Sequence, residues 1–196
     1  DAVLVKGPES AKMYPCPQRR MGGDIDWWFR GEGDWDKALE IVEKNSLVWN
    51  RDSDGDVNYV LSGVVVEHHR HGLDAEGPMG ELLLRCEHAL HHAMVTGMGL
   101  KQYCDYIMAL DYYRGQYDET EYSSLLSSRG LSEWEGRLRS EDPRLLKMVF
   151  RDGQMGRGKR FRFGGFFPRA LYFLRVCPGL FLNRWAGLVF GHIGRI

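Results

Sequence analysis

The spacing of apolar residues changes near residue 75, and this change restricts the fold more than any other feature of the sequence. Before residue 75, short β-branched runs alternate with one amphipathic stretch over residues 35–45, which we predict to be a helix. After it, apolar residues recur at helical spacing in successive segments that are separated by Gly or Pro. We therefore predict an α+β protein with a strand-rich core over residues 1–75 and a helical region over residues 76–196.

The limits of individual elements follow from the same patterns. Strands of the core are predicted at residues 2–5, 46–49, 57–61 and 64–66. Helices of the second region are predicted at residues 81–95, 100–113, 119–129 and 131–138, with a further helix beginning at Pro143. The sequence Asp-Ser-Asp-Gly-Asp at residues 52–56 predicts a solvated hairpin turn. A calcium loop is disfavoured there, because Gly63 stands where such a loop needs Glu.

Two acidic residues, Asp24 and Asp26, flank a single apolar residue. Side chains of a strand alternate between its faces, so we expect both carboxylates on one side, with Ile25 and Trp27 behind them in the core. Two acids at this distance repel each other unless a cation lies between them. Oxygen ligands on a rigid strand suit Mg²⁺, which proteins usually bind together with substrate phosphates. The alternative interpretation is a surface turn with two solvated acids.

Further charged residues stand near the ends of the predicted strands. Lys6 and Gly7 follow the first strand, and could place an ammonium group and a closely approaching backbone beside a phosphate. Arg20 stands shortly before the acid pair, and Glu67 closes the run at residues 64–66. Buried strands rarely carry acids without a specific role. Together these residues predict a site for a metal ion and a phosphorylated ligand.

The order of these motifs resembles a nucleotidyltransferase family of bacterial proteins within the DNA polymerase beta-like superfamily. The segments VLVKG, YPCPQRRMGGDIDWWF and VVVEHH carry the resemblance, and HALHHAMVTGMGLKQYCDYIMAL and RDGQMGRG extend it over most of residues 2–160. The match is strongest at Asp24, Asp26 and Glu67. The resemblance implies a polymerase-beta-like mixed sheet as the catalytic core, followed by a helical C-terminal region.

The resemblance also implies the reaction, which is transfer of a nucleoside monophosphate from a nucleoside triphosphate to an acceptor. The acceptor would be a small molecule, a protein or RNA. Asp24 and Asp26 would bind Mg²⁺, or Mn²⁺ in its place, and Glu67 would be a third ligand or the base that activates the acceptor hydroxyl. In such sites, carboxylates fix ions that stabilise the attacking and leaving oxygens of an in-line displacement.

Binding of the nucleotide is assigned by the same resemblance to Lys6, Gly7 and Arg20, with Ser10 as a weaker candidate. The superfamily usually opens a helix with a Gly-Ser pair at this place. Here Lys-Gly-Pro-Glu-Ser stands over residues 6–10, so the serine is displaced from the usual position. Catalysis of phosphoryl-type transfer rests mostly on positioning and charge neutralisation, which suits these cations.

The second region contributes two further candidates, His88 and Asp105. Each is expected either to border the acceptor pocket or to make a structural hydrogen bond or salt bridge. A zinc site is disfavoured, because the sequence lacks a His-Glu-x-x-His motif and the histidines at residues 68–71 match no standard zinc spacing.

Composition adds limits to the partners and the compartment. The 26 basic and 27 acidic residues nearly cancel, so no overall field favours nucleic acid. Residues 157–163 interleave cations with aromatic rings and could still bind single-stranded nucleic acid, RNA included, a triphosphate or an acidic acceptor; the alternative is a solvated strand or loop rim. The apolar tail at residues 166–193 is interrupted by Arg and Pro, so we predict no membrane span; it could pack on the domain, a partner or a membrane surface.

The four cysteines form no Cys-x-x-Cys pair and no signal peptide is visible, so we expect a cytoplasmic protein with reduced thiols. Residue 1 is not Met and a strand begins almost at once, so we expect further sequence before it. A non-catalytic nucleotide- or partner-binding module with the same fold is the alternative to an enzyme. The complete set of Asp24, Asp26 and Glu67 favours the enzyme. The sequence specifies neither the acceptor, nor the base of the nucleotide, nor the oligomeric state.

Overall fold

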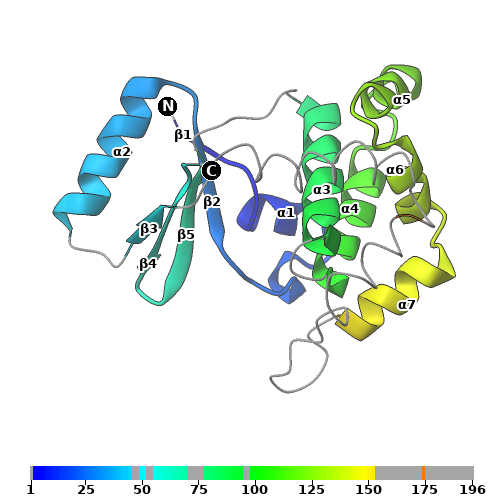
Figure 1. Cartoon of the computed structure of the whole chain (residues 1–196), viewed down its shortest axis with the longest axis horizontal. Helices are drawn as coiled ribbons and strands as arrows, with labels where there is room; N and C mark the ends of the chain where they lie inside the picture. The colour runs from blue at the N-terminus through cyan, green and yellow to red at the C-terminus, as the bar shows by residue number, and fades with distance from the viewer. Residues whose placement is uncertain are drawn as a thin grey trace. The chain divides into compact units, whose positions relative to one another are not determined.

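The computed structural model describes residues 2–45, 49–51, 55–69, 77–94, 98–152 and 174. The chain separates into two compact units, residues 1–74 and residues 75–196, and each is described by itself (Figure 1). The first unit contains a five-stranded sheet, and the described part of the second is helical. The α+β class predicted from the sequence is therefore confirmed.

The sheet of the first unit mixes parallel and antiparallel pairs. Its strands are β1 (Ala2–Leu4), β2 (Ile25–Phe29), β3 (Trp49–Arg51), β4 (Val57–Leu61) and β5 (Val64–His69). Their order across the sheet is β1-β2-β5-β4-β3. The central strands β2 and β5 are parallel, and the other neighbours are antiparallel. Because β2 and β5 are parallel neighbours at the centre of the sheet, Asp26 of β2 lies directly beside Glu67 of β5.

A tight turn connects β4 and β5. Leu61 pairs with Val64, so only Ser62 and Gly63 lie between the strands. Both have positive φ, 51° and 82°, which is the backbone conformation that two-residue hairpin turns require. The turn fixes the register along the whole hairpin, so that Val57 pairs with His68.

Helix α2 (Glu32–Lys44) covers one face of the sheet (Figure 1). Its Trp35 and Val42 are buried with Val57 of β4, and Phe29, Leu39 and Tyr59 pack against this cluster. The helix begins three residues before the predicted position 35, because the N–H groups of Asp34 and Trp35 donate to the Gly31 carbonyl oxygen at 3.0 and 3.1 Å. Two shorter elements, α1 (Pro8–Lys12) and the 3₁₀ helix η1 (Pro17–Arg19), connect β1 to β2.

The second unit contains helices α3 (Gly77–Met94), α4 (Leu100–Tyr112), α5 (Glu119–Ser128), α6 (Ser132–Arg139) and α7 (Pro143–Asp152). Helix α4 packs against α3, α6 and α7, and α5 packs against α6. The largest fully buried side chains include Leu82, Leu90, Tyr106, Tyr122, Trp134 and Leu138. None of the described helices has the length and apolar character needed to cross a bilayer.

Asp142 immediately precedes α7 and anchors its first turn. Its Oδ1 accepts the backbone N–H of Arg144 at 2.8 Å, and its Oδ2 accepts Nη1 of Arg137 at 2.6 Å. Burial raises the pKa of Asp142, but these hydrogen bonds and the Arg137 charge outweigh burial and hold the pKa below its usual value. The carboxylate therefore stabilises the folded state only while it is ionised.

We expect Asp142→Ala to lower the free energy of unfolding by about 1 kcal/mol at pH 7, as for other lost helix caps. The stabilisation that the Asp142 carboxylate gives to the wild type is complete above the unfolded-state pKa of about 3.9. It is lost as the pH falls through the lower folded-state pKa. Denaturant unfolding at pH 7 and pH 2.5 measures both effects. Asp111→Ala removes an exposed carboxylate paired with Arg114 and is the control, with a change under about 0.5 kcal/mol. Equal effects of the two substitutions would contradict this role.

Candidate functional site

The carboxylates of Asp26 and Glu67 lie on one face of the sheet, on its two central strands. These residues are register partners in the parallel pair β2–β5, so their side chains project to the same side. Asp26 is fully buried, and the side chain of Glu67 is 28% exposed. His69 stands two residues after Glu67 and shares its face. One ligand atom from each of Asp26, Glu67 and His69 lies within 4.8 Å of the others, so this group could hold a metal ion.

Asp24 lies outside this group. Strand β2 begins at Ile25, so Asp24 precedes the strand, and the alternation expected from the sequence does not extend to it. Its negative charge nevertheless acts on Glu67, whose pKa is raised by burial, then by the charge of Asp26 and also by that of Asp24. Ile25 and Trp27 are half-buried, not core residues as the sequence predicted.

The two oxygens of Asp26 have different surroundings. Oδ1 is 2.7 Å from Nζ of Lys6 and 3.0 Å from Nε2 of His69. Oδ2 is buried and has no hydrogen-bond partner among the described residues. Burial raises the pKa of Asp26, but its bonds from His69 and Lys6 outweigh burial and lower it to about 2. Asp26 is therefore ionised at neutral pH, with one oxygen available to a cation.

His69 connects Asp26 to a second carboxylate. Its Nδ1 is 2.6 Å from Oδ2 of Asp56, and its Nε2 is 3.9 Å from Oε2 of Glu67. Burial lowers the pKa of His69, but the bonds to Asp26 and Asp56 outweigh burial and raise it to about 9. Asp56 is 19% exposed, which differs from the solvated turn predicted for residues 52–56; residues 52–54 lie outside the described part.

Sequence reasoning missed the roles of His69 and Asp56. His69 could have been found from strand alternation, because residues two apart on a strand share a face and Glu67 was already a candidate. Asp56 carries no such signal. It is brought to His69 by the pairing of β4 with β5, which joins residues thirteen positions apart.

Lys6 reaches the acids through a backbone that only glycine allows. Gly7 has φ of +70°, and a Cβ built on it would lie 2.7 Å from the carbonyl oxygen of Asp24. Arg20 Nη1 donates to the Gly7 carbonyl oxygen at 3.0 Å. The structure therefore brings Lys6, Gly7 and Arg20 together beside the acids. Ser10, the fourth candidate for nucleotide binding, lies in α1 and is 2% exposed.

We expect Gly7→Ala to destabilise the first unit by about 1–3 kcal/mol, the usual cost of an unfavourable backbone conformation. The close approach to the Asp24 carbonyl oxygen would also displace Lys6 from Asp26. Thermal unfolding measures the loss of stability. Gly33→Ala is the matched control, because Gly33 lies in α2 with nothing within 4 Å of its added Cβ. That substitution should stabilise the helix by about 0.5–1 kcal/mol, so equal behaviour of the two variants would refute the argument.

His88 and Asp105 belong to the second unit, on α3 and α4. The ring of His88 contacts the ring of His92 at 4.5 Å between centroids in an edge-on arrangement. Asp105 is half-buried. Their role at an acceptor pocket stays a prediction. Residues 157–163, predicted as an RNA- or phosphate-binding segment, lie outside the described residues.

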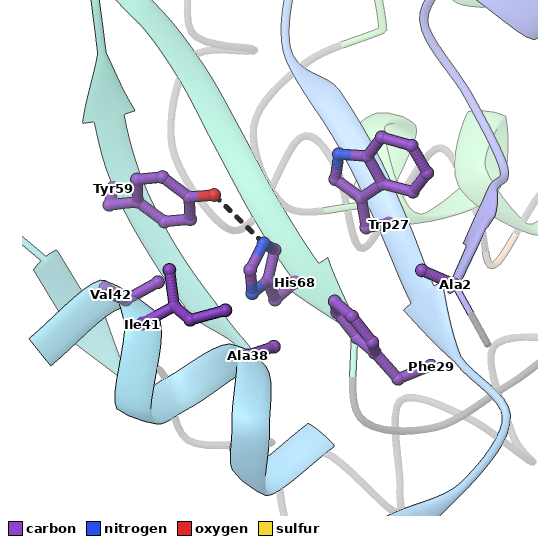
Figure 2. Close-up of a pocket in the computed structure, with 8 residues that line it drawn as sticks. All are labelled: Ala2, Trp27, Phe29, Ala38, Ile41, Val42, Tyr59 and His68. Atoms are coloured by element: carbon purple, nitrogen blue, oxygen red, sulfur yellow. Dashed lines mark hydrogen bonds between the residues drawn. The ribbon is translucent and has the colours of Figure 1, made fainter. Parts of the chain in front are cut away.

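A pocket of about 240 Å³ lies on the opposite face of the sheet, beside α2 (Figure 2). It is lined by Ala2, Trp27, Phe29, Ala38, Ile41, Val42, Tyr59 and His68. His68 projects between Tyr59 and Phe29, and its Nε2 is 3.0 Å from the Tyr59 hydroxyl (Figure 2). Burial, and secondarily the charge of His69, lowers the pKa of His68 to about 4. This pocket is mostly apolar, and the strand backbone separates it from the acids.

Comparison with known proteins gave no match among family models, curated proteins or solved structures. The fold and the site therefore define the chain by themselves, as an α+β protein with Asp26, Glu67 and His69 grouped on the face of its sheet opposite the α2 pocket.

Proposed function

We propose that this protein is a metal-dependent nucleotidyltransferase, which transfers a nucleoside monophosphate from a nucleoside triphosphate to an acceptor hydroxyl. The observation that carries the proposal is the buried Asp26, whose Oδ2 has no partner among the described residues while Glu67 lies beside it on the adjacent parallel strand. A buried polar atom without a partner is rare in folded proteins, and a bound cation would satisfy it.

The donor set fits a small divalent cation. Asp26 and Glu67 present carboxylate oxygens, and Asp24 lies close enough to raise the pKa of Glu67. Oxygen donors suit Mg²⁺ or Mn²⁺. We assign Asp24, Asp26 and Glu67 to hold the metal, which when bound would stabilise the charge of the attacking and leaving oxygens.

The cations of the site would bind the triphosphate. Lys6 stands 2.7 Å from Asp26, with 15% of its side chain exposed, so its ammonium is at the site before any ligand binds. Arg20 holds the Gly7 carbonyl, and thereby supports the turn that carries Lys6. Positioning and charge neutralisation of this kind account for most of the catalysis in phosphoryl-type transfer.

The reaction forms one bond and breaks one. The acceptor oxygen attacks the α-phosphorus, the bond from that phosphorus to the bridging oxygen of the β-phosphate breaks, and pyrophosphate leaves. The acceptor proton passes to a base. Glu67, with its raised pKa, is the candidate for that base if it does not complete the ligand set.

Calorimetric titration with each of the four nucleoside triphosphates, with and without Mg²⁺, tests the proposal. Wild-type protein should bind one or more of them only with the metal, and the Asp24→Asn/Asp26→Asn double variant should lose this binding while remaining folded by circular dichroism. If the wild type binds none of the four in the presence of Mg²⁺, the proposal is wrong.

One observation favours the alternative, a non-catalytic binding module. Lys6 and His69 already place two cationic groups on Asp26, so the buried charge is partly compensated without a metal. The alternative predicts triphosphate binding without release of pyrophosphate. Assays of pyrophosphate release with candidate small-molecule, protein and RNA acceptors separate the two functions.

A further inference from the structure

We propose that His69 and Asp56 are positioning residues that orient Asp26, so that its Oδ2 faces the bound cation and its Oδ1 does not. This inference rests on the proposed function, and it assigns to two residues outside the acid motif a part in metal binding. It differs from the simplest interpretation of the Asp26–Glu67–His69 group, in which the imidazole is itself a ligand.

The first argument is the unequal use of the two Asp26 oxygens. Oδ1 is contacted by both Lys6 and His69, at 2.7 and 3.0 Å. Oδ2, equally buried, has no hydrogen-bond partner in the described part of the chain. Two donors on one oxygen fix the rotation of the carboxylate, because turning it would break both contacts. The other oxygen of Asp26, Oδ2, is thereby held in one orientation.

The second argument is that both nitrogens of His69 are already in use. Nε2 contacts Asp26 at 3.0 Å, and Nδ1 contacts Asp56 at 2.6 Å. An imidazole binds a metal through one of these nitrogens, so ligation would require His69 to give up a carboxylate contact. A ring held at both nitrogens is better suited to fix the carboxylates than to bind the ion.

The third argument is that the sheet itself sets this arrangement. Asp56 directly precedes β4 and His69 ends β5, and the pairing of Val57 with His68 brings them together across the antiparallel ladder. The side chains of Asp56 and His69 are only 19% and 21% exposed, so their contact is largely shielded from water. Removal of a residue that hydrogen-bonds to the metal ligands and orients them typically lowers metal affinity by about 10–100-fold.

Binding of Mn²⁺ to the full chain, followed by electron paramagnetic resonance, tests the inference. The probes are Mn²⁺ alone and Mn²⁺ with each triphosphate. We expect Asp56→Ala and His69→Ala to weaken Mn²⁺ binding by about 10–100-fold, and Asp56→Asn, which keeps an acceptor for Nδ1–H, to restore most of it. Glu40→Ala is the matched control, because Glu40 is an exposed carboxylate paired with Lys44 on α2. Its Mn²⁺ affinity should equal that of the wild type.

A second measurement separates a positioning role from ligation. Pulsed electron paramagnetic resonance of the wild-type Mn²⁺ complex should show no coupling to a directly bound nitrogen. Such a coupling, lost in His69→Ala, would overturn the inference and make His69 a ligand, while the metal site itself would stand. Wild-type affinity in folded Asp56→Ala would also overturn it. Failure of the wild type to bind Mn²⁺, alone or with any triphosphate, would instead overturn the proposed function.

Discussion

We expect Asp26→Asn to reduce the proposed nucleotidyl transfer by about 10³-fold or more. A catalytic metal contributes several kcal/mol of transition-state stabilisation, and each 1.36 kcal/mol corresponds to a factor of ten in rate. Asn keeps the size of the side chain but removes the negative charge that attracts the cation. Pyrophosphate release at saturating triphosphate, with Mg²⁺ varied, measures the loss. Retention of more than a tenth of the wild-type rate would show that Asp26 does not bind the metal.

The same substitution should also cost stability, because it leaves Lys6 and His69 beside an uncharged partner. Breaking a buried ion pair typically costs about 3–5 kcal/mol. We expect the lower end, since Lys6 and His69 are 15% and 21% exposed and can gain water. Glu67→Gln is the control, because Oε2 of Glu67 lies 3.9 Å from Nε2 of His69, farther than the 3.0 Å between that nitrogen and Asp26. The Glu67→Gln variant should lose about as much activity as Asp26→Asn, with a much smaller change in the free energy of unfolding. The comparison therefore separates a loss of activity from a loss of stability.

The largest effect on stability is expected from Trp134→Ala in the second unit. Trp134 is completely buried in α6, and its Nε1–H donates to the Cys86 carbonyl oxygen of α3 at 3.1 Å. Truncation leaves a large cavity and removes the hydrogen bond between the two helices, and should lower the free energy of unfolding by about 3–5 kcal/mol. Denaturant unfolding measured by circular dichroism at 222 nm, where helices dominate, reports this unit.

Two other substitutions calibrate that result. Trp134→Phe keeps most of the ring but removes the donor, and should cost about 1–3 kcal/mol. Trp49→Ala makes the same change of residue type at a position in β3 where the side chain is 39% exposed, and should cost less than about 1 kcal/mol. If Trp49→Ala and Trp134→Ala had equal effects, the buried packing of Trp134 would not be the source of the stability.

Helices were the most predictable part of the fold. The predictions of residues 100–113 and 119–129 agree with α4 and α5 to within one residue. Both helices have an amphipathic pattern and a clear beginning: Gly99 precedes α4, and Asp118 caps α5 by accepting the N–H of Glu121 at 2.8 Å. These signals are local, and so they can be seen in the sequence.

Strands were less predictable, because their limits depend on partners distant in the chain. The strand predicted at residues 57–61 matches β4, where alternation and a glycine turn agree. The strand predicted at residues 46–49 differs from β3, which is Trp49–Arg51; residues 46–48 lie outside the described part. At the site, Asp26 and Glu67 were predicted to act together, and they are register partners in the sheet. Asp56 lies beside His69 only because of the β4–β5 register, which the sequence does not reveal.

The contact between Gly7 and Asp24 has a consequence for re-engineering the protein. Gly7 meets the main chain of Asp24, not its side chain, and Val5 N–H donates to the main-chain oxygen of Asp26 at 3.0 Å. The loop that carries Lys6 is therefore aligned with the acid-bearing strand by backbone contacts as well as by the Lys6–Asp26 ion pair. These backbone contacts do not depend on which side chain stands at position 24. For the proposed metal site, substitution of residue 24 by Glu or His is therefore a way to alter metal preference while the backbone contacts of the Lys6 loop are kept.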